Sequence, residues 1–136
     1  MAPNENFDPN PYNVIEQFFE ASVEGDSEAV KNFLAGGTVD VNSQDKIFGE
    51  TALHQASKNG HMGIVELLLS SNADPTMKTK VGKTPMHYAS TQGHINIMKL
   101  LYDTGADLKA QDMHLLTPLH EVNILKNICI FWKFGT

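Results

Sequence analysis

Apolar residues recur along this chain at the spacing of short amphipathic helices. Ile64-Val65-Leu67-Leu68 and Ile97-Met98-Leu100-Leu101 each place apolar side chains on one face of a helix. A shorter segment precedes each of them, at residues 51–60 and 84–93, and both segments open with threonine and close with glycine. The threonine hydroxyl caps a helix start by accepting a backbone N–H, and glycine adopts the left-handed conformation that ends a helix. The pattern therefore predicts pairs of short antiparallel helices.

The same elements return every 33 residues. Thr51-Ala52-Leu53-His54-Gln55-Ala56 recurs as Thr84-Pro85-Met86-His87-Tyr88-Ala89 and begins again at Thr117-Pro118-Leu119-His120. This period with this start resembles the ankyrin repeat, and the resemblance covers roughly residues 14–120. It implies a mainly α solenoid, in which each repeat is a β-hairpin or turn followed by an antiparallel helix pair. Stacking the repeats buries the apolar faces that no single pair can bury alone.

The two ends of the array depart from the repeat. Gly25 stands 35 residues before Gly60, so the first copy carries two extra residues, one of them near residues 46–48. The last copy has Lys126-Asn127 where the repeat predicts Gly-His. The expected organisation is a disordered leader at 1–13, an N-terminal capping repeat at 14–48, repeats at 49–81 and 82–114, and a truncated, divergent last repeat at 115–136.

Composition narrows the class of protein. The chain of 136 residues is 41% apolar, which fits one globular domain, and it holds no run of about 18 apolar residues for a membrane span. It has no secretory signal at its start, and Cys129 is its single cysteine, so we expect a cytoplasmic or nuclear rather than a secreted protein. The net charge is −6 and there is no arginine, which argues against nucleic acid as a partner.

The residue types that suggest catalysis have simpler interpretations here. His54, His87 and His120 return with the repeat, so we interpret them as structural residues that bond the threonine hydroxyl and nearby backbone, with no metal site. The glycines match neither a G-x-G-x-x-G loop nor a Walker pattern, and no G-x-S-x-G motif occurs. We therefore expect no enzyme activity, no catalytic residue and no cofactor.

Positions that the repeat leaves free carry the functional signal. The resemblance implies that the turn before each first helix, here called a finger, and the first helices themselves line a concave groove that binds other proteins. The lysines alone also fit solvated turns, but apolar residues at turn tips indicate a contact. We expect a partner with an acidic and partly apolar surface. The candidate binding residues are Lys46, Ile47, Phe48, Glu50, Gln55, Lys58, Lys78, Lys80, Val81, Lys83, Tyr88, Thr91, Met113, His114 and Leu116.

Two further features of the sequence bear on function. Leu115 stands where the other fingers have Gly49 and Gly82, and a left-handed conformation at that position disfavours leucine. The tail is rich in apolar residues and has no polar cap, which leaves open an alternative role. In that alternative, a truncated ankyrin product self-associates or competes with a longer form through Ile128, Phe131, Trp132 and Phe134.

Overall fold

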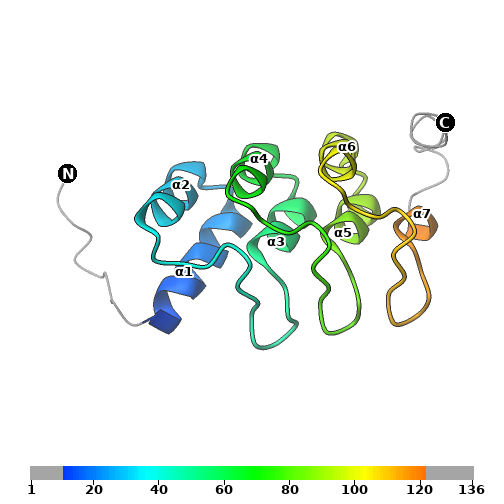
Figure 1. Ribbon diagram of the computed structural model, residues 1–136, viewed down its shortest axis with the longest axis horizontal. Coiled ribbons are helices and arrows are strands. Elements are labelled where there is room, and N and C mark those ends of the chain that lie inside the picture. Colours follow the sequence, from blue (N-terminus) through cyan, green and yellow to red (C-terminus); the bar gives the residue numbers. More distant parts are fainter. Residues whose placement is uncertain (1–10, 122–136) are drawn as a thin grey trace.

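The computed structural model describes residues 11–121, which form a stack of helix pairs (Figure 1). The first helices of the repeats lie side by side in one row, and the second helices form a parallel row above them. The first-helix row consists of α1 (Pro11–Glu24), α3 (Ala52–Asn59), α5 (Pro85–Gln92) and α7 (Pro118–Glu121). The second-helix row consists of α2 (Ser27–Gly36), α4 (Met62–Ser70) and α6 (Ile95–Asp103). The predicted mainly α solenoid is confirmed.

Local chemistry sets the helix boundaries that the sequence predicts. Thr51 caps α3 and its hydroxyl accepts the backbone N–H of His54, while Pro85 occupies the first turn of α5. Gly60 and Gly93 end these two helices at φ angles of +77° and +74°, where only glycine is unstrained. The repeat motif thus encodes both ends of each first helix.

The first helix of the array begins earlier than the sequence analysis placed it. The predicted leader ended at residue 13, but α1 starts at Pro11. Proline suits the first turn of a helix because its missing N–H would have no partner there and its φ angle is already helical. α1 is 14 residues long whereas α3 has eight, so the capping repeat has an extended first helix.

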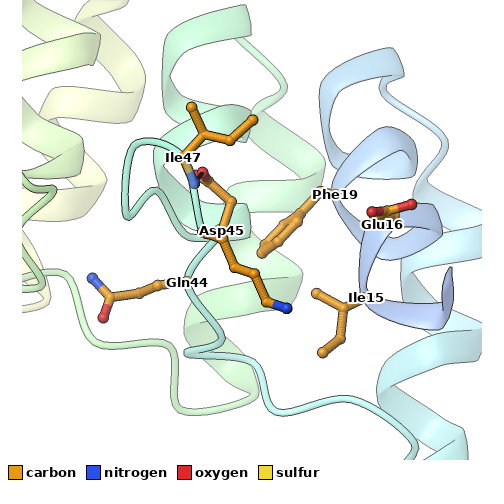
Figure 2. A pocket seen from close by; sticks show the side chains of 7 residues that line it. Ile15, Glu16, Phe19, Gln44, Asp45 and Ile47 are labelled. Atoms are coloured by element: carbon orange, nitrogen blue, oxygen red, sulfur yellow. Dashed lines mark hydrogen bonds between the residues drawn. The ribbon is translucent and has the colours of Figure 1, made fainter. Parts of the chain in front are cut away.

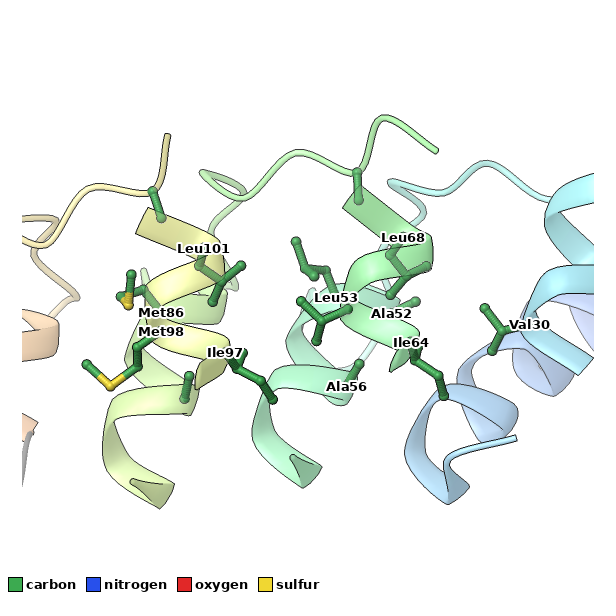
Figure 3. Packing of buried hydrophobic residues seen from close by; sticks show 14 of the residues in the cluster. Val30, Ala52, Leu53, Ala56, Ile64, Leu68, Met86, Ile97, Met98 and Leu101 are labelled. Carbon is green, nitrogen blue, oxygen red and sulfur yellow. The ribbon is translucent and has the colours of Figure 1, made fainter. Parts of the chain in front are cut away.

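Buried side chains from both rows form one core that runs through the stack (Figure 3). Phe18, Leu53 and Met86 occupy equivalent places in the first helices, and each is at most 1% exposed. Figure 3 shows Ile64 and Ile97 reaching from their helices toward the preceding repeat. Burying a side chain of this size stabilises the fold by about 1.5–3 kcal/mol. Each repeat therefore depends on its neighbour for much of its stability.

The predicted β-hairpins are turns in the part of the chain that the structure describes, where no strand occurs. They project from the first-helix side as three loops (Figure 1): finger 1 (residues 45–50), finger 2 (residues 79–83) and finger 3 (residues 112–116). Hydrogen bonds close each base, from Asp45 N to Glu50 O, Thr79 N to Lys83 O and Asp112 N to Leu116 O. Finger 1 has one residue more than the others, which confirms the predicted insertion near residues 46–48.

Candidate protein-binding surface

Each finger is held rigid by one side chain at its base. Asp45 Oδ1 accepts the N–H groups of Ile47 (2.8 Å) and Phe48 (2.7 Å), and its Oδ2 accepts the N–H of Glu50 (2.7 Å). Desolvation alone would raise the pKa of Asp45, but the backbone donors hold it below its ordinary value of 3.8. Asp45 therefore remains a carboxylate at neutral pH and keeps the loop in one conformation.

The other two fingers use the same device with different side chains. Thr79 Oγ1 accepts the N–H groups of Val81 and Lys83 at 3.3 and 3.1 Å. Asp112 Oδ1 accepts those of His114 and Leu116 at 2.8 and 3.0 Å. Burial would raise the pKa of Asp112, but these donors and the ammonium of Lys83, 3.9 Å from Oδ2, lower it. All three loops are thus preorganised.

Backbone hydrogen bonds join the fingers into a row. Lys80 N donates to Phe48 O at 2.9 Å, and Met113 N donates to Val81 O at 2.8 Å. The close approach explains the glycine in finger 2, because a Cβ on Gly82 would lie 3.1 Å from the Cα of Asp112. The three loops therefore form a single edge of the molecule.

Histidines fasten this edge to the first helices. His54 Nδ1 accepts the N–H of Thr51 at 3.0 Å, so its Nε2 carries the proton and donates to the carbonyl of Lys83 at 3.0 Å. His87 repeats this arrangement with Thr84 and Leu116. Burial lowers the pKa of His54 to about 4, so its ring stays neutral at physiological pH. The predicted structural role of these histidines is confirmed.

The finger tips expose large apolar side chains. Phe48, Met113 and Leu115 are 63%, 62% and 67% exposed, and Ile47 is more exposed still. Because backbone hydrogen bonds join the fingers, these side chains lie on neighbouring loops along one edge of the molecule. We call this set the apolar ridge: Ile47, Phe48, Val81, Met113, Leu115 and Leu116.

Leu115 takes up a conformation that leucine disfavours. Its φ angle is +62°, beside +70° at Gly49 and +81° at Gly82. The left-handed conformation costs a residue with a Cβ about 1–2 kcal/mol. A leucine that is two-thirds exposed adds little to the core, so packing does not offset the strain of this conformation.

The finger lysines differ in how firmly they are held. Lys46, Lys78 and Lys80 are exposed, and the ammonium of Lys80 donates to the carbonyl of Lys46. Lys83 is half-buried and pairs with Asp112. Three exposed lysines therefore lie on or next to fingers 1 and 2, whereas the charge of Lys83 is partly neutralised within the fold.

The structure changes the interpretation of the residues on the helix side of the fingers. Glu50 was expected to face a partner, but it is 7% exposed. Its carboxylate accepts hydrogen bonds from the Gln55 amide and, at 2.6 Å, from the Tyr88 hydroxyl. The Tyr88 ring packs edge-on against His54, and the ammonium of Lys58 lies 5.8 Å from the ring centroid. Glu50 therefore belongs to an internal network, because the turn that carries it points its carboxylate toward α3 and α5.

Two binding candidates remain to be placed, and the residues predicted for self-association lie elsewhere in the chain. Thr91 and His114 are exposed, and the Thr91 hydroxyl donates to the carbonyl of His87. Ile128, Phe131, Trp132 and Phe134, proposed for self-association, lie outside the described residues. Among residues 11–121, no helix is long and apolar enough to cross a bilayer, and no three His, Cys, Asp or Glu side chains gather as metal ligands would.

Sequence reasoning missed one part of this surface. A pocket of about 500 Å³ opens between α1 and finger 1 (Figure 2). Ile15, Glu16 and Phe19 form its helix side, and none of them was a candidate. A signal was present, because Phe19 stands six residues before Gly25, as His54 does before Gly60. With phenylalanine in place of histidine at this position, the first repeat has no ring N–H to donate to a carbonyl of the following finger, as His54 and His87 do.

The comparisons with known proteins agree with the geometry. The family described as ankyrin repeats (3 copies) matches residues 18–112. Human Ankyrin repeat domain-containing protein 40 is 42% identical over 67 residues, which is 49% of this chain and 18% of that protein. Ankyrin repeat and SAM domain-containing protein 6 of Rattus norvegicus is 36% identical over 80 residues, covering 55% of this chain and 9% of that protein.

Palmitoyltransferase AKR1 of Candida glabrata is a third relative, 32% identical over 71 residues that make up 52% of this chain and 9% of the enzyme. The chain thus spans less than a fifth of the length of these relatives. Ankyrin repeats in general mediate contacts between proteins and are typically non-catalytic. With the family matching most of its length and the repeat visible in both sequence and structure, the chain belongs to the ankyrin repeat family.

Proposed function

We propose that this chain is a non-catalytic adaptor or inhibitor that binds a partner protein through its fingers and first helices. The apolar ridge carries the proposal. Six large apolar side chains stand exposed on loops that internal hydrogen bonds already hold in place. Binding then requires little ordering of the loops, which removes a cost that weakens many interfaces.

The charges beside the ridge indicate the character of the partner. Lys46 and Lys80 are exposed on the fingers and Lys78 is exposed just before finger 2, whereas Asp45 and Asp112 accept backbone N–H groups within their own fingers. A partner with acidic residues around an apolar patch would be attracted over a distance and then held by apolar contact. Tyr88 joins α5 to the base of finger 1 and to α3, since its hydroxyl donates to Glu50 and its ring packs against His54.

A library of displayed protein fragments, selected on the full chain, tests this function. We expect enriched fragments that combine acidic with apolar residues, and we expect Phe48→Ser and Met113→Ser each to weaken their binding at least tenfold. Ile95→Ser is the control, because Ile95 is also exposed, at 40%, but lies on the second-helix row. Fragments whose binding survives both finger variants and is lost with Ile95→Ser would contradict the proposal.

Self-association is a second candidate, and one observation favours it. The rings of His61 and His94 lie against Gly25 and Gly60 of the preceding repeat, and a Cβ at either glycine would come within 2.8 Å. The corresponding neighbour of Gly93 falls within residues 122–136, which lie outside the described residues. In the sequence this segment is rich in apolar residues, among them Ile128, Phe131, Trp132 and Phe134, which a second copy of the chain would cover in a dimer.

Light scattering of the full chain at several concentrations, beside a version that ends at Glu121, tests this second candidate. A dimer or larger species that the shorter chain does not form would support it. A full chain that remains monomeric at all concentrations would remove it.

A further inference from the structure

The pocket between α1 and finger 1 follows from a substitution within the repeat. In the next two repeats, His54 and His87 bridge their own helix to the following finger by donating to the carbonyls of Lys83 and Leu116. The equivalent residue in the first repeat is Phe19, whose ring has no donor. Finger 1 is therefore not fastened to α1 in this way, and a space of about 500 Å³ is left between them.

The lining of this space is suited to an apolar side chain. Figure 2 shows Ile15 and Phe19 extending from α1 toward the segment that carries Asp45 and Ile47. Ile15 and Phe19 are half-buried, and Ile47 is 75% exposed at the edge of the opening. A volume of about 500 Å³ lies within the range of about 300–1,000 Å³ typical of ligand-binding pockets. It has room for the side chain of a phenylalanine or leucine.

The two walls of the pocket carry opposite charges. Lys46 lines the finger side and Glu16 lines the helix side, and both residues are exposed. The third charged residue of the lining, Asp45, directs both carboxylate oxygens to the backbone of finger 1. A bound segment therefore meets a cation at the finger and an anion at the helix.

We propose that this pocket receives a bulky apolar side chain from the partner, with an adjacent acidic residue paired to Lys46. The inference rests on the proposed function, because it takes the fingers to be the binding surface. It adds the anchor and its location: the pocket lies at the finger 1 end of the apolar ridge, and Ile47 belongs to both. The partner segment thus runs from the ridge into the pocket.

Short fluorescent peptides test this anchor on the full chain. The probe contains Asp-Glu-Phe within a serine-rich sequence, and two matched peptides replace Phe by Ser or the two acids by Lys. We expect the probe to bind and both replacements to weaken binding at least tenfold. When the probe binds, the amide chemical shifts of the chain should change most at residues 15–19 and 44–47.

Variants of the chain separate the pocket from the remainder of the surface. Ile47→Ser and Lys46→Gln alter exposed side chains, so each should weaken binding of the probe at least fivefold while the chain still folds. Glu16→Gln removes the opposing charge and should strengthen binding two- to threefold, whereas Ile95→Ser should leave it unchanged. Equal binding of all three peptides, or shift changes confined to the second-helix row, would overturn the inference.

Two outcomes distinguish this inference from the proposed function. If selected fragments lose affinity with Phe48→Ser and Met113→Ser but not with Ile47→Ser or Lys46→Gln, the finger surface binds partners and the pocket inference is wrong. If the probe binds only after Phe7→Ser is introduced, the acid-flanked Phe7 of the chain itself occupies the pocket. That second result would overturn the assignment of the pocket to a partner.

Discussion

Replacing His54 by leucine tests whether the histidines hold the repeats and fingers together. The ring is fully buried, and it joins the start of α3 to the base of finger 2 through Thr51 N–H and the Lys83 carbonyl. Leucine has a similar volume but neither bond. His54→Leu therefore leaves two backbone groups without these partners and changes the packing little.

The expected loss follows from the cost of those groups. The Thr51 N–H loses its partner at a cost of about 1–3 kcal/mol, and the Lys83 carbonyl, which keeps the N–H of Thr79, loses one bond worth about 0.5–1.5 kcal/mol. The free energy of unfolding at pH 7 should therefore fall by about 3 kcal/mol. The pH dependence should change as well. The pKa of His54 is about 4 in the folded chain and 6.5 in the unfolded reference. The unfolded chain therefore binds more protons between these values, and stability falls as pH falls.

The contribution of His54 to the pH dependence of stability can be calculated and compared with experiment. From pH 7 to pH 5, His54 alone should remove about 2 kcal/mol from the free energy of unfolding, and about 3 kcal/mol once the pH is below 4. In His54→Leu this contribution is absent. The variant should therefore lose about 2 kcal/mol less than the parent chain between pH 7 and pH 5.

Urea unfolding followed by circular dichroism at pH 7, 6 and 5 measures both quantities. His114→Leu is the matched control, because His114 is exposed on finger 3, and its stability should stay within about 0.5 kcal/mol of the parent. A His54→Leu chain as stable as the parent at pH 7, or one with the parent's full pH dependence, would refute the reasoning.

Three further predictions concern the helix ends and the fingers, and urea unfolding measures the stability of each variant. Gly60→Ala should cost at least about 1 kcal/mol more than Gly93→Ala. Both glycines have positive φ, but a Cβ at Gly60 would lie 2.7 Å from the ring of His94, whereas no atom of the described residues lies within 4 Å of a Cβ at Gly93; equal losses would contradict this difference. Leu115→Gly should leave stability unchanged or raise it by up to about 1 kcal/mol, since relief of strain offsets the entropy of glycine, while fragment binding weakens; a clear destabilisation would refute the assignment of strain. Asp45→Asn should cost about 1–2 kcal/mol because asparagine has one acceptor oxygen for three N–H groups, and a loss below about 0.3 kcal/mol would show that finger 1 does not need the carboxylate.

The sequence predicted those parts of the fold that short-range chemistry determines. Thr51, Pro85 and Gly60 mark helix boundaries through their own backbone preferences, so the motif alone locates the first helices. The start of α1 was placed three residues late, because Pro11 stands among asparagines and prolines that also favour turns. A proline at a helix start and a proline in a turn have the same local signature.

The binding surface was harder to predict because burial depends on contacts between distant residues. Phe48 and Met113 were expected to be exposed and are. Glu50 was expected to be exposed but is buried, since its partner Tyr88 lies 38 positions away in the chain. The pocket beside Phe19 depends on a hydrogen-bond donor that Phe19 lacks and that His54 and His87 supply in the next repeats. This difference is visible in the sequence only when the repeats are compared position by position.

Hydrogen exchange of the full chain, with and without a selected partner fragment, tests most directly whether the fingers form the binding surface. Bound fragment should slow exchange of the amides in residues 44–50, 79–83 and 112–116, with a smaller effect at residues 15–19 of α1. Exchange in α4 and α6 should change little. Protection confined to those two helices, with the fingers unaffected, would show that the chain binds through its opposite side and would contradict the account.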